Sequence, residues 1–119
     1  MRVLVVEDEM TLADAVARGL RRHGMSVDVA YDGDDGYDKA TSAGYDVLVL
    51  DRDLPGRSGD EICRSVTAAG PPPLVMMMTA SDSDADKATG LSLGASDYVT
   101  KPFQFADLVE RVRALGNAS

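Results

Sequence analysis

The sequence is poor in cysteine, in positive charge and in long hydrophobic runs, and each shortage excludes a class of protein. Cys63 is the single cysteine, so no disulfide can form within the chain, which agrees with a reducing compartment. The 12 Lys and Arg against 20 Asp and Glu give a net charge of -8, which argues against direct nucleic-acid binding. No apolar run approaches the length of a bilayer span, and the acidic opening MRVLVVEDE is unlike a signal peptide. We therefore expect no contact with a membrane and a cytoplasmic location.

Two hydrophobic periodicities take turns along the 119 residues, a length that fits one compact domain. Short apolar or alternating runs predict five strands, at 3–6, 27–29, 47–50, 74–78 and 98–99. Apolar residues at helical spacing predict five helices, near 12–20, 37–40, 62–66, 88–91 and 105–112. Strands that are apolar on both faces, each followed by a helix, indicate an α/β fold. We expect a doubly wound parallel sheet with helices on both faces.

The residues that follow each predicted strand are the candidates for a site, because such sheets bind ligands beyond the carboxyl ends of their strands. Glu7 and Asp8 follow the first strand, and Asp51 follows the third. If these two strands are neighbours, as in the flavodoxin-like order 2-1-3-4-5, the three carboxylates share one hollow. Carboxylates that lie so close attract a hard divalent cation, and Mg²⁺ is the cation that we expect.

Thr79 after the fourth strand and Lys101 after the fifth add a hydroxyl group and a positive charge. A carboxylate can attack phosphorus and form an aspartyl phosphate where positive charge offsets the accumulating negative charge. Asp51, at a strand tip that a donor can reach, is the candidate nucleophile. Lys101 would supply the charge, and the Thr79 hydroxyl would donate to a phosphoryl oxygen. The alternative is that the acids and Thr79 only cap the helices that follow them.

Four motifs follow one another along the chain, namely VLVVEDE, VLVLDRDLPGRSG, MMMTA and SDYVTKPF. Together they resemble the receiver domain of two-component response regulators, and the likeness covers essentially all of residues 1–119. The resemblance implies that Asp51 accepts a phosphoryl group from a phosphohistidine of a sensor histidine kinase. It also implies that Asp8, Asp51 and the backbone carbonyl of Asp53 coordinate Mg²⁺, with Glu7 helping through water. Such a domain catalyses only its own phosphorylation and dephosphorylation.

The same resemblance implies a conformational switch. Thr79 would move toward the phosphoryl group, and the ring of Tyr98 would turn into the vacated space. The surface formed by the fourth helix, the fifth strand and the fifth helix would then change. Lys101 would hold the phosphoryl group, and the Lys101–Pro102 peptide bond is expected to be cis. Gly59 either permits a backbone path that a Cβ would resist or is an ordinary loop glycine.

The segment DYVTKPFQFADLVERVRAL is similar to receivers attached to winged-helix DNA-binding domains, the OmpR/PhoB-like subfamily. In that subfamily this face forms a two-fold homodimer after phosphorylation. Lys87 with Asp107 and Asp97 with Arg111 are therefore candidate pairs between subunits, against the alternative of exposed charges that contribute little. The chain ends without an effector domain, so we expect a fragment of a DNA-binding regulator or a receiver that acts alone.

Three other classes of protein are weighed against this interpretation. A receiver-like module that binds partners without phosphorylation would usually lack one of the acids or the lysine. An aspartate-nucleophile phosphatase has a second Asp two residues after the first, as Asp51 and Asp53 do, but DRDLPG leaves little chain for a substrate-recognition insertion. A flavin-binding protein would need a loop rich in hydroxyl groups or glycine after the first strand, and EDEMT is unsuited to a phosphate.

Overall fold

Five strands and five helices alternate along the computed structural model, which describes residues 1–42, 44–70, 72–81 and 83–117. In chain order, the elements are β1 (Arg2–Val6), α1 (Met10–Arg21), β2 (Ser26–Ala30), α2 (Gly33–Thr41), β3 (Val47–Asp51), α3 (Gly59–Ala68), β4 (Leu74–Thr79), α4 (Asp84–Ser92), β5 (Asp97–Thr100) and α5 (Phe105–Asn117). The strands form one parallel sheet in the order β2-β1-β3-β4-β5, which confirms the predicted fold. In the described part of the chain, no helix combines the length and the apolar character needed to span a membrane.

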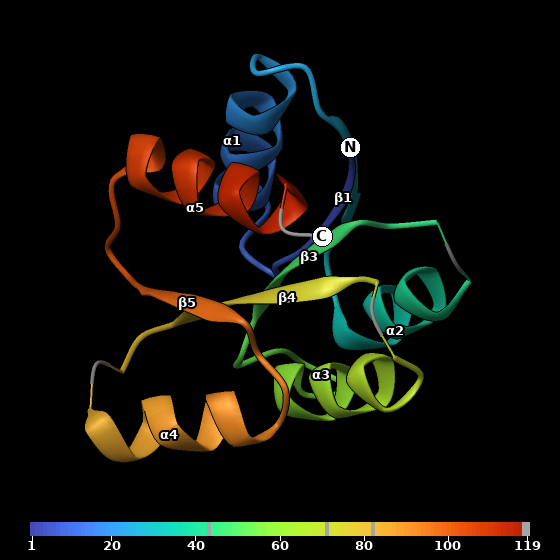
Figure 1. Cartoon of the computed structure of the whole chain (residues 1–119), viewed down its shortest axis with the longest axis vertical. Coiled ribbons are helices and arrows are strands. Elements are labelled where there is room, and N and C mark those ends of the chain that lie inside the picture. The colour runs from blue at the N-terminus through green and yellow to red at the C-terminus, as the bar shows by residue number, and fades with distance from the viewer. Residues whose placement is uncertain (43, 71, 82, 118–119) are drawn as a thin grey trace.

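The sheet is covered on both faces, with α1 and α5 on one side and α2, α3 and α4 on the other (Figure 1). Successive residues of a strand point to opposite faces, so each strand supplies two cores. Val47 and Val49 pack in the core under α1 and α5, whereas Leu48 and Leu50 pack in the core under α2 and α3. All five residues of β3 are buried, as the continuous apolar run predicts.

Two apolar residues that the helical spacing placed on buried faces are exposed. Leu91 of α4 is 49% exposed and Phe105 of α5 is 43% exposed. α4 lies beside the edge of the sheet, where only Gly90 of this helix is buried. Phe105 opens α5 and packs edge-on against Phe103, with ring centroids 5.6 Å apart. Periodicity identifies the apolar stripe of a helix, but the area that covers the stripe depends on the neighbouring elements.

We expect Leu48→Ala to lower the free energy of unfolding by about 2–5 kcal/mol, because it leaves a cavity in a fully buried core position. Leu91→Ala removes the same atoms from an exposed position, and its effect should stay within about 0.5 kcal/mol. Urea denaturation followed by circular dichroism measures both. Equal losses for the two variants would contradict this arrangement of the core.

Candidate functional site

The carboxyl ends of the central strands bring three acids together at one edge of the sheet. Glu7 and Asp8 follow β1, Asp51 ends β3, and these two strands are hydrogen-bonded neighbours. One carboxylate oxygen from each acid lies within 4.8 Å of the others. Glu7 and Asp51 are buried and Asp8 is exposed, so the cluster opens to solvent on the side of Asp8. The structure thus brings together the acids that the strand ends predicted.

Lys101 and Thr79 complete this cluster from β5 and β4. The Lys101 ammonium donates a hydrogen bond to Glu7 Oε1 and lies 3.6 Å from Asp51 Oδ2. Thr79 is buried at the end of β4, where its carbonyl accepts a hydrogen bond from Lys101 N (2.7 Å). The Lys101–Pro102 peptide bond is cis, as expected. A single ammonium group therefore faces two buried carboxylates.

The loop after β3 folds back tightly against the phosphoacceptor candidate. Asp53 N donates a hydrogen bond to Asp51 Oδ1 (3.1 Å), and Gly59 N donates to Arg52 O (3.0 Å). A Cβ on Gly59 would lie 2.2 Å from the carbonyl oxygen of Asp51, so no larger residue fits without a backbone shift. The glycine is needed for this close approach, which settles the choice that the sequence left open.

The pKa values of the two buried acids shift in opposite directions, because burial dominates at Asp51 and hydrogen bonds dominate at Glu7. Burial raises the pKa of Asp51 to about 7, and the hydrogen bond with Glu7 adds to the rise. Burial alone would also raise the pKa of Glu7, but hydrogen bonds with Asp51 and Lys101 outweigh it and lower the pKa. Burial disfavours the Lys101 ammonium, but its bond to Glu7 and the charge of Asp51 raise the pKa overall. Without a cation and below about pH 7, Asp51 is therefore the acid of this pair that holds a proton, while Glu7 and Lys101 stay charged.

The capping alternative is wrong for Asp51 and Thr79. The Asp51 carboxylate accepts from Asp53 N and the Thr79 hydroxyl accepts from Ser81 N (3.1 Å), both within the loop that follows the strand. The helices after β3 and β4 are capped instead by Ser58 and Ser83. The two strand-end side chains are thus free for another role.

The four charged residues proposed for a dimer lie together on α4, β5 and α5. Within one chain, Arg111 forms an ion pair with Asp97 (2.9 Å) and a second with Asp107 (3.1 Å). The Lys87 ammonium lies 5.1 Å from the centre of the Tyr98 ring. These residues border one polar hollow, so the structure places them on one face. The pairs between subunits stay predictions.

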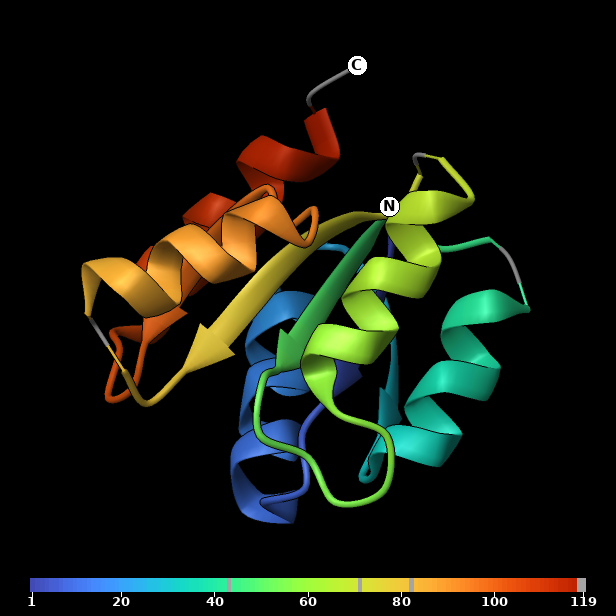
Figure 2. The same ribbon diagram turned by 90° about the horizontal axis from the view of Figure 1, so that it is seen from below.

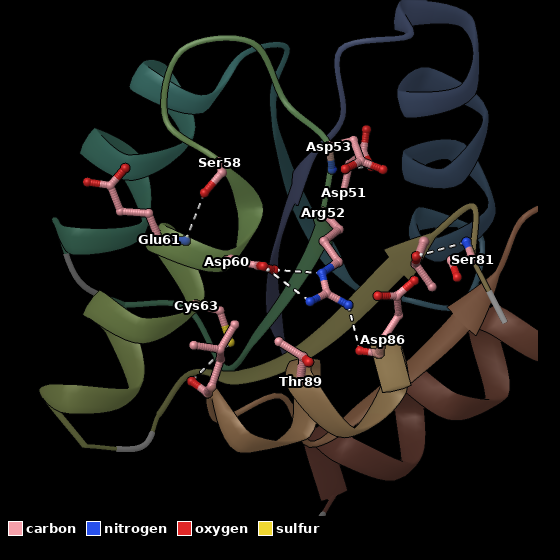
Figure 3. A network of polar contacts seen from close by, with 12 residues as sticks. Asp51, Arg52, Asp53, Ser58, Asp60, Glu61, Cys63, Ser81, Asp86 and Thr89 are labelled. Carbon is pink, nitrogen blue, oxygen red and sulfur yellow. Dashed lines mark hydrogen bonds and ion pairs between the residues drawn. The ribbon is translucent and has the colours of Figure 1, made fainter. Parts of the chain in front are cut away.

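Arg52 is a charged residue of this region whose contacts the sequence reasoning missed. Its guanidinium group binds the Asp60 carboxylate of α3 and the Asp86 carbonyl of α4 (Figure 3). The sequence carried one signal, an arginine between two acids directly after a fully apolar strand. Its partners lie 8 and 34 residues away, which no local pattern reveals.

We expect Asp51→Asn to stabilise the protein in the absence of divalent cations, and more at pH 8 than at pH 5. The pKa of Asp51 is about 7 in the folded protein against an ordinary value of 3.8, so the folded state binds the additional proton between these values. The free energy of unfolding of the wild type therefore falls as the pH rises through this range, and asparagine removes that fall. Urea denaturation in EDTA should show a gap between the two proteins that widens by about 1–3 kcal/mol from pH 5 to pH 8.

Asp53→Asn is the matched control, because Asp53 is exposed and the substitution removes the same charge two residues away. This substitution leaves the buried Asp51 carboxylate in place, so the variant should still lose stability as the pH rises from 5 to 8, as the wild type does. A constant gap between wild type and Asp51→Asn would contradict the raised pKa of Asp51.

The chain matches a known protein family along nearly its whole length. The family model of the response regulator receiver domain matches residues 3–113. The transcriptional regulatory protein CutR of Streptomyces coelicolor is 56% identical over 116 residues, which are 98% of this chain and 54% of CutR. The transcriptional regulatory protein DltR of Streptococcus agalactiae is 45% identical over 113 residues, 95% of this chain and 50% of DltR. The chain thus spans about half the length of these relatives.

Solved structures agree with this match. The receiver domain of Francisella response regulator 1452 superposes with a TM-score of 0.91 at 30% identity, covering 97% of this chain and 95% of that one. DrrB of Thermotoga maritima, an OmpR/PhoB homologue, superposes with a TM-score of 0.87 at 34% identity, covering 94% of this chain and 50% of DrrB. Such a match sets aside the flavin-binding and phosphatase alternatives. The chain belongs to the family of response regulator receiver domains.

Proposed function

We propose that this receiver accepts a phosphoryl group on Asp51 from a phosphohistidine of a sensor histidine kinase in the cytoplasm. The observation that carries the proposal is the position of the Asp51 carboxylate. It lies at the tip of a buried strand, within 4.8 Å of two other acids and 3.6 Å from the Lys101 ammonium. The family membership of the chain supports the same role.

The transfer makes one bond and breaks one. An Asp51 oxygen attacks the phosphorus atom, the bond between phosphorus and the donor histidine nitrogen breaks, and that nitrogen keeps the electron pair. The attacking carboxylate must be ionised, and the Lys101 ammonium favours the ionised form. Lys101 would then bind one phosphoryl oxygen. The Thr79 hydroxyl, which now accepts a hydrogen bond from Ser81 N, would leave that partner and donate to a second phosphoryl oxygen.

The acids of the site fit Mg²⁺ by their chemistry. Three carboxylates approach one another this closely, and in the described part of the chain Lys101 is the one ammonium group that pairs with them. The negative charge that remains is one that a hard cation neutralises. Asp8, Asp51 and the backbone carbonyl of Asp53 would hold the cation, with Glu7 acting through water. When bound, Mg²⁺ supplies positive charge to the phosphoryl oxygens.

Phosphorylation would be transmitted through Thr79 and Tyr98 to the face formed by α4, β5 and α5. Tyr98 is partly buried on β5 and borders the same small cavity as Thr79. Movement of Thr79 toward the phosphoryl group would let the Tyr98 ring turn inward and reshape this face. The altered face would form a two-fold dimer through Lys87, Asp97, Asp107 and Arg111.

Transcriptional regulation is the output that we infer from the relatives of this chain. CutR and DltR are transcriptional regulators about twice as long as the part matched here. The net charge of -8 is unsuited to binding DNA directly, so a separate DNA-binding domain would contact the nucleic acid. The receiver would control that domain through dimerisation.

Intact-mass spectrometry after incubation with acetyl phosphate tests the phosphoacceptor. We expect one phosphoryl adduct that requires Mg²⁺, because the cation and Lys101 together offset the charge of the transferred group. Asp51→Asn should abolish the adduct, and Asp53→Asn should retain it because only the backbone of Asp53 is needed. An absence of any adduct on the wild type would favour a module that binds partners without phosphorylation.

Mixing two oppositely charged variants tests the dimer. Arg111→Glu and Asp97→Arg each disrupt the pair between these residues, so each variant alone should self-associate less than wild type after activation with acetyl phosphate. In a two-fold dimer of one Arg111→Glu chain with one Asp97→Arg chain, one of the two pairs has its charges reversed and the other is native. Both pairs are then attractive, and dimers should return in analytical ultracentrifugation.

The mixture is the decisive sample because neither variant chain can form an attractive pair between positions 97 and 111 within itself. A chain with both substitutions could re-form the internal pair that the structure shows. A mixture that stays monomeric while wild type dimerises would contradict the pairing between subunits.

A further inference from the structure

Arg52 directly follows the phosphoacceptor, but its side chain runs away from the acidic cluster and between α3 and α4 (Figure 3). This side chain is only 13% exposed, and Asp60 is 31% exposed. A charged group with so little contact with water is stable only where its donors are satisfied. The burial of Arg52 therefore depends on the partners that it has on both helices.

The guanidinium group joins the two helices through three hydrogen bonds. Nε and one terminal nitrogen donate to the two oxygens of Asp60, at 2.8 Å and 3.2 Å. The other terminal nitrogen donates to the backbone carbonyl of Asp86, in the first half of α4, at 2.6 Å. The planar fork of arginine makes this double contact possible, and the single ammonium of lysine cannot reproduce it.

Apart from the contact with Arg52, α4 is held only weakly. Gly90 is its only buried residue, and the helix lies beside the edge of the sheet, as Figure 2 also shows. Its far end is tied to α3, because the Thr67 hydroxyl donates to the Leu93 carbonyl (3.1 Å). Arg52 therefore ties the first half of α4 to α3, and the Lys87 ammonium near the Tyr98 ring is a second polar contact of this half.

A small, partly open hollow lies under this restraint, bordered by Arg52, Thr79, Gly90 and Tyr98. Its volume is about 10 Å³, room for about one water molecule. A tyrosine ring is much larger than this space, so an inward turn of Tyr98 needs the residues that line it to move. Movement of Thr79 would vacate part of the room that the ring needs and a shift of α4 would supply the rest, and the Arg52 contacts oppose that shift.

We propose that Arg52 is a positioning residue that clamps α4 to α3 and so sets how readily the receiver switches. The clamp stabilises the arrangement in which the hollow is too small for the Tyr98 ring. Removing it favours the arrangement that accommodates Tyr98, and by thermodynamic linkage it raises the affinity of the site for a phosphoryl group. This inference rests on the proposed function of Asp51, but the clamp itself can be measured without phosphorylation.

Hydrogen exchange measured by mass spectrometry tests the clamp in the unmodified protein. Arg52→Met keeps most of the aliphatic stem and removes the three hydrogen bonds. We expect the amides of residues 86–92 to exchange about fivefold faster than in wild type, while β1 and β3 keep their protection. Arg52→Lys should give an intermediate rate because it retains charge without the fork.

Titration with beryllofluoride at saturating Mg²⁺, followed by fluorine NMR, tests the effect on switching. We expect Arg52→Met to bind beryllofluoride about fivefold more tightly than wild type. Arg57→Met is the matched control, because Arg57 lies in the same loop and pairs with Glu61 of α3 without contacting α4. This control should leave both the exchange of α4 and the affinity unchanged.

The outcomes separate the clamp from the proposed function. Failure of the wild type to bind beryllofluoride with Mg²⁺ would contradict the phosphoacceptor role, and the exchange experiment would still decide whether Arg52 restrains α4. Exchange of α4 that is unchanged in Arg52→Met would overturn the clamp. A third outcome is that the wild type binds beryllofluoride and α4 of Arg52→Met exchanges faster, but this variant binds beryllofluoride no more tightly than the wild type. That outcome would overturn the role of Arg52 in switching.

Discussion

The structure depends on a concentration of negative charge at the end of a buried strand. Asp51 ends β3, where every residue is buried, and it meets Glu7 at the end of β1 because the two parallel strands are neighbours. Burial raises the pKa of Asp51 to about 7, so the carboxylate is costly to keep ionised without a positive partner. Lys101 supplies one such partner just after β5, and a bound cation would supply further positive charge. The site therefore favours groups that bring positive charge to the carboxylates.

Much of this architecture could be predicted because it follows from periodicity. Runs such as residues 47–50 have no polar face, so they require cover on both sides, and each is followed by a helical pattern. Parallel strands then place their following residues at one edge, which is why Glu7, Asp8 and Asp51 could be grouped before the structure was known. The order of the strands determines where the site lies, and the alternation of strand and helix patterns along the sequence predicts that order.

Contacts between distant segments could not be predicted in the same way. Gly59 is needed because its helix begins against the carbonyl of Asp51, a crowding that becomes visible only when the loop is folded. Leu91 has the spacing of a core residue, but its helix lies at an edge where little covers it. Arg52 reaches a carbonyl 34 residues further along the chain. In each case the partner comes from tertiary packing, which a local pattern does not encode.

The helices differ in how deeply they are buried, and this difference connects the acidic site with the surface formed by α4, β5 and α5. α1 and α5 share a core to which every strand contributes, whereas α4 buries a single glycine. A signalling domain needs one element that can move at low cost while the site geometry stays fixed, and the least buried helix meets that requirement. A helix held only by weak packing would move without a signal. A restraint anchored beside Asp51 resolves this conflict, because Arg52 holds α4 through a few polar bonds that a modest coupling free energy can break.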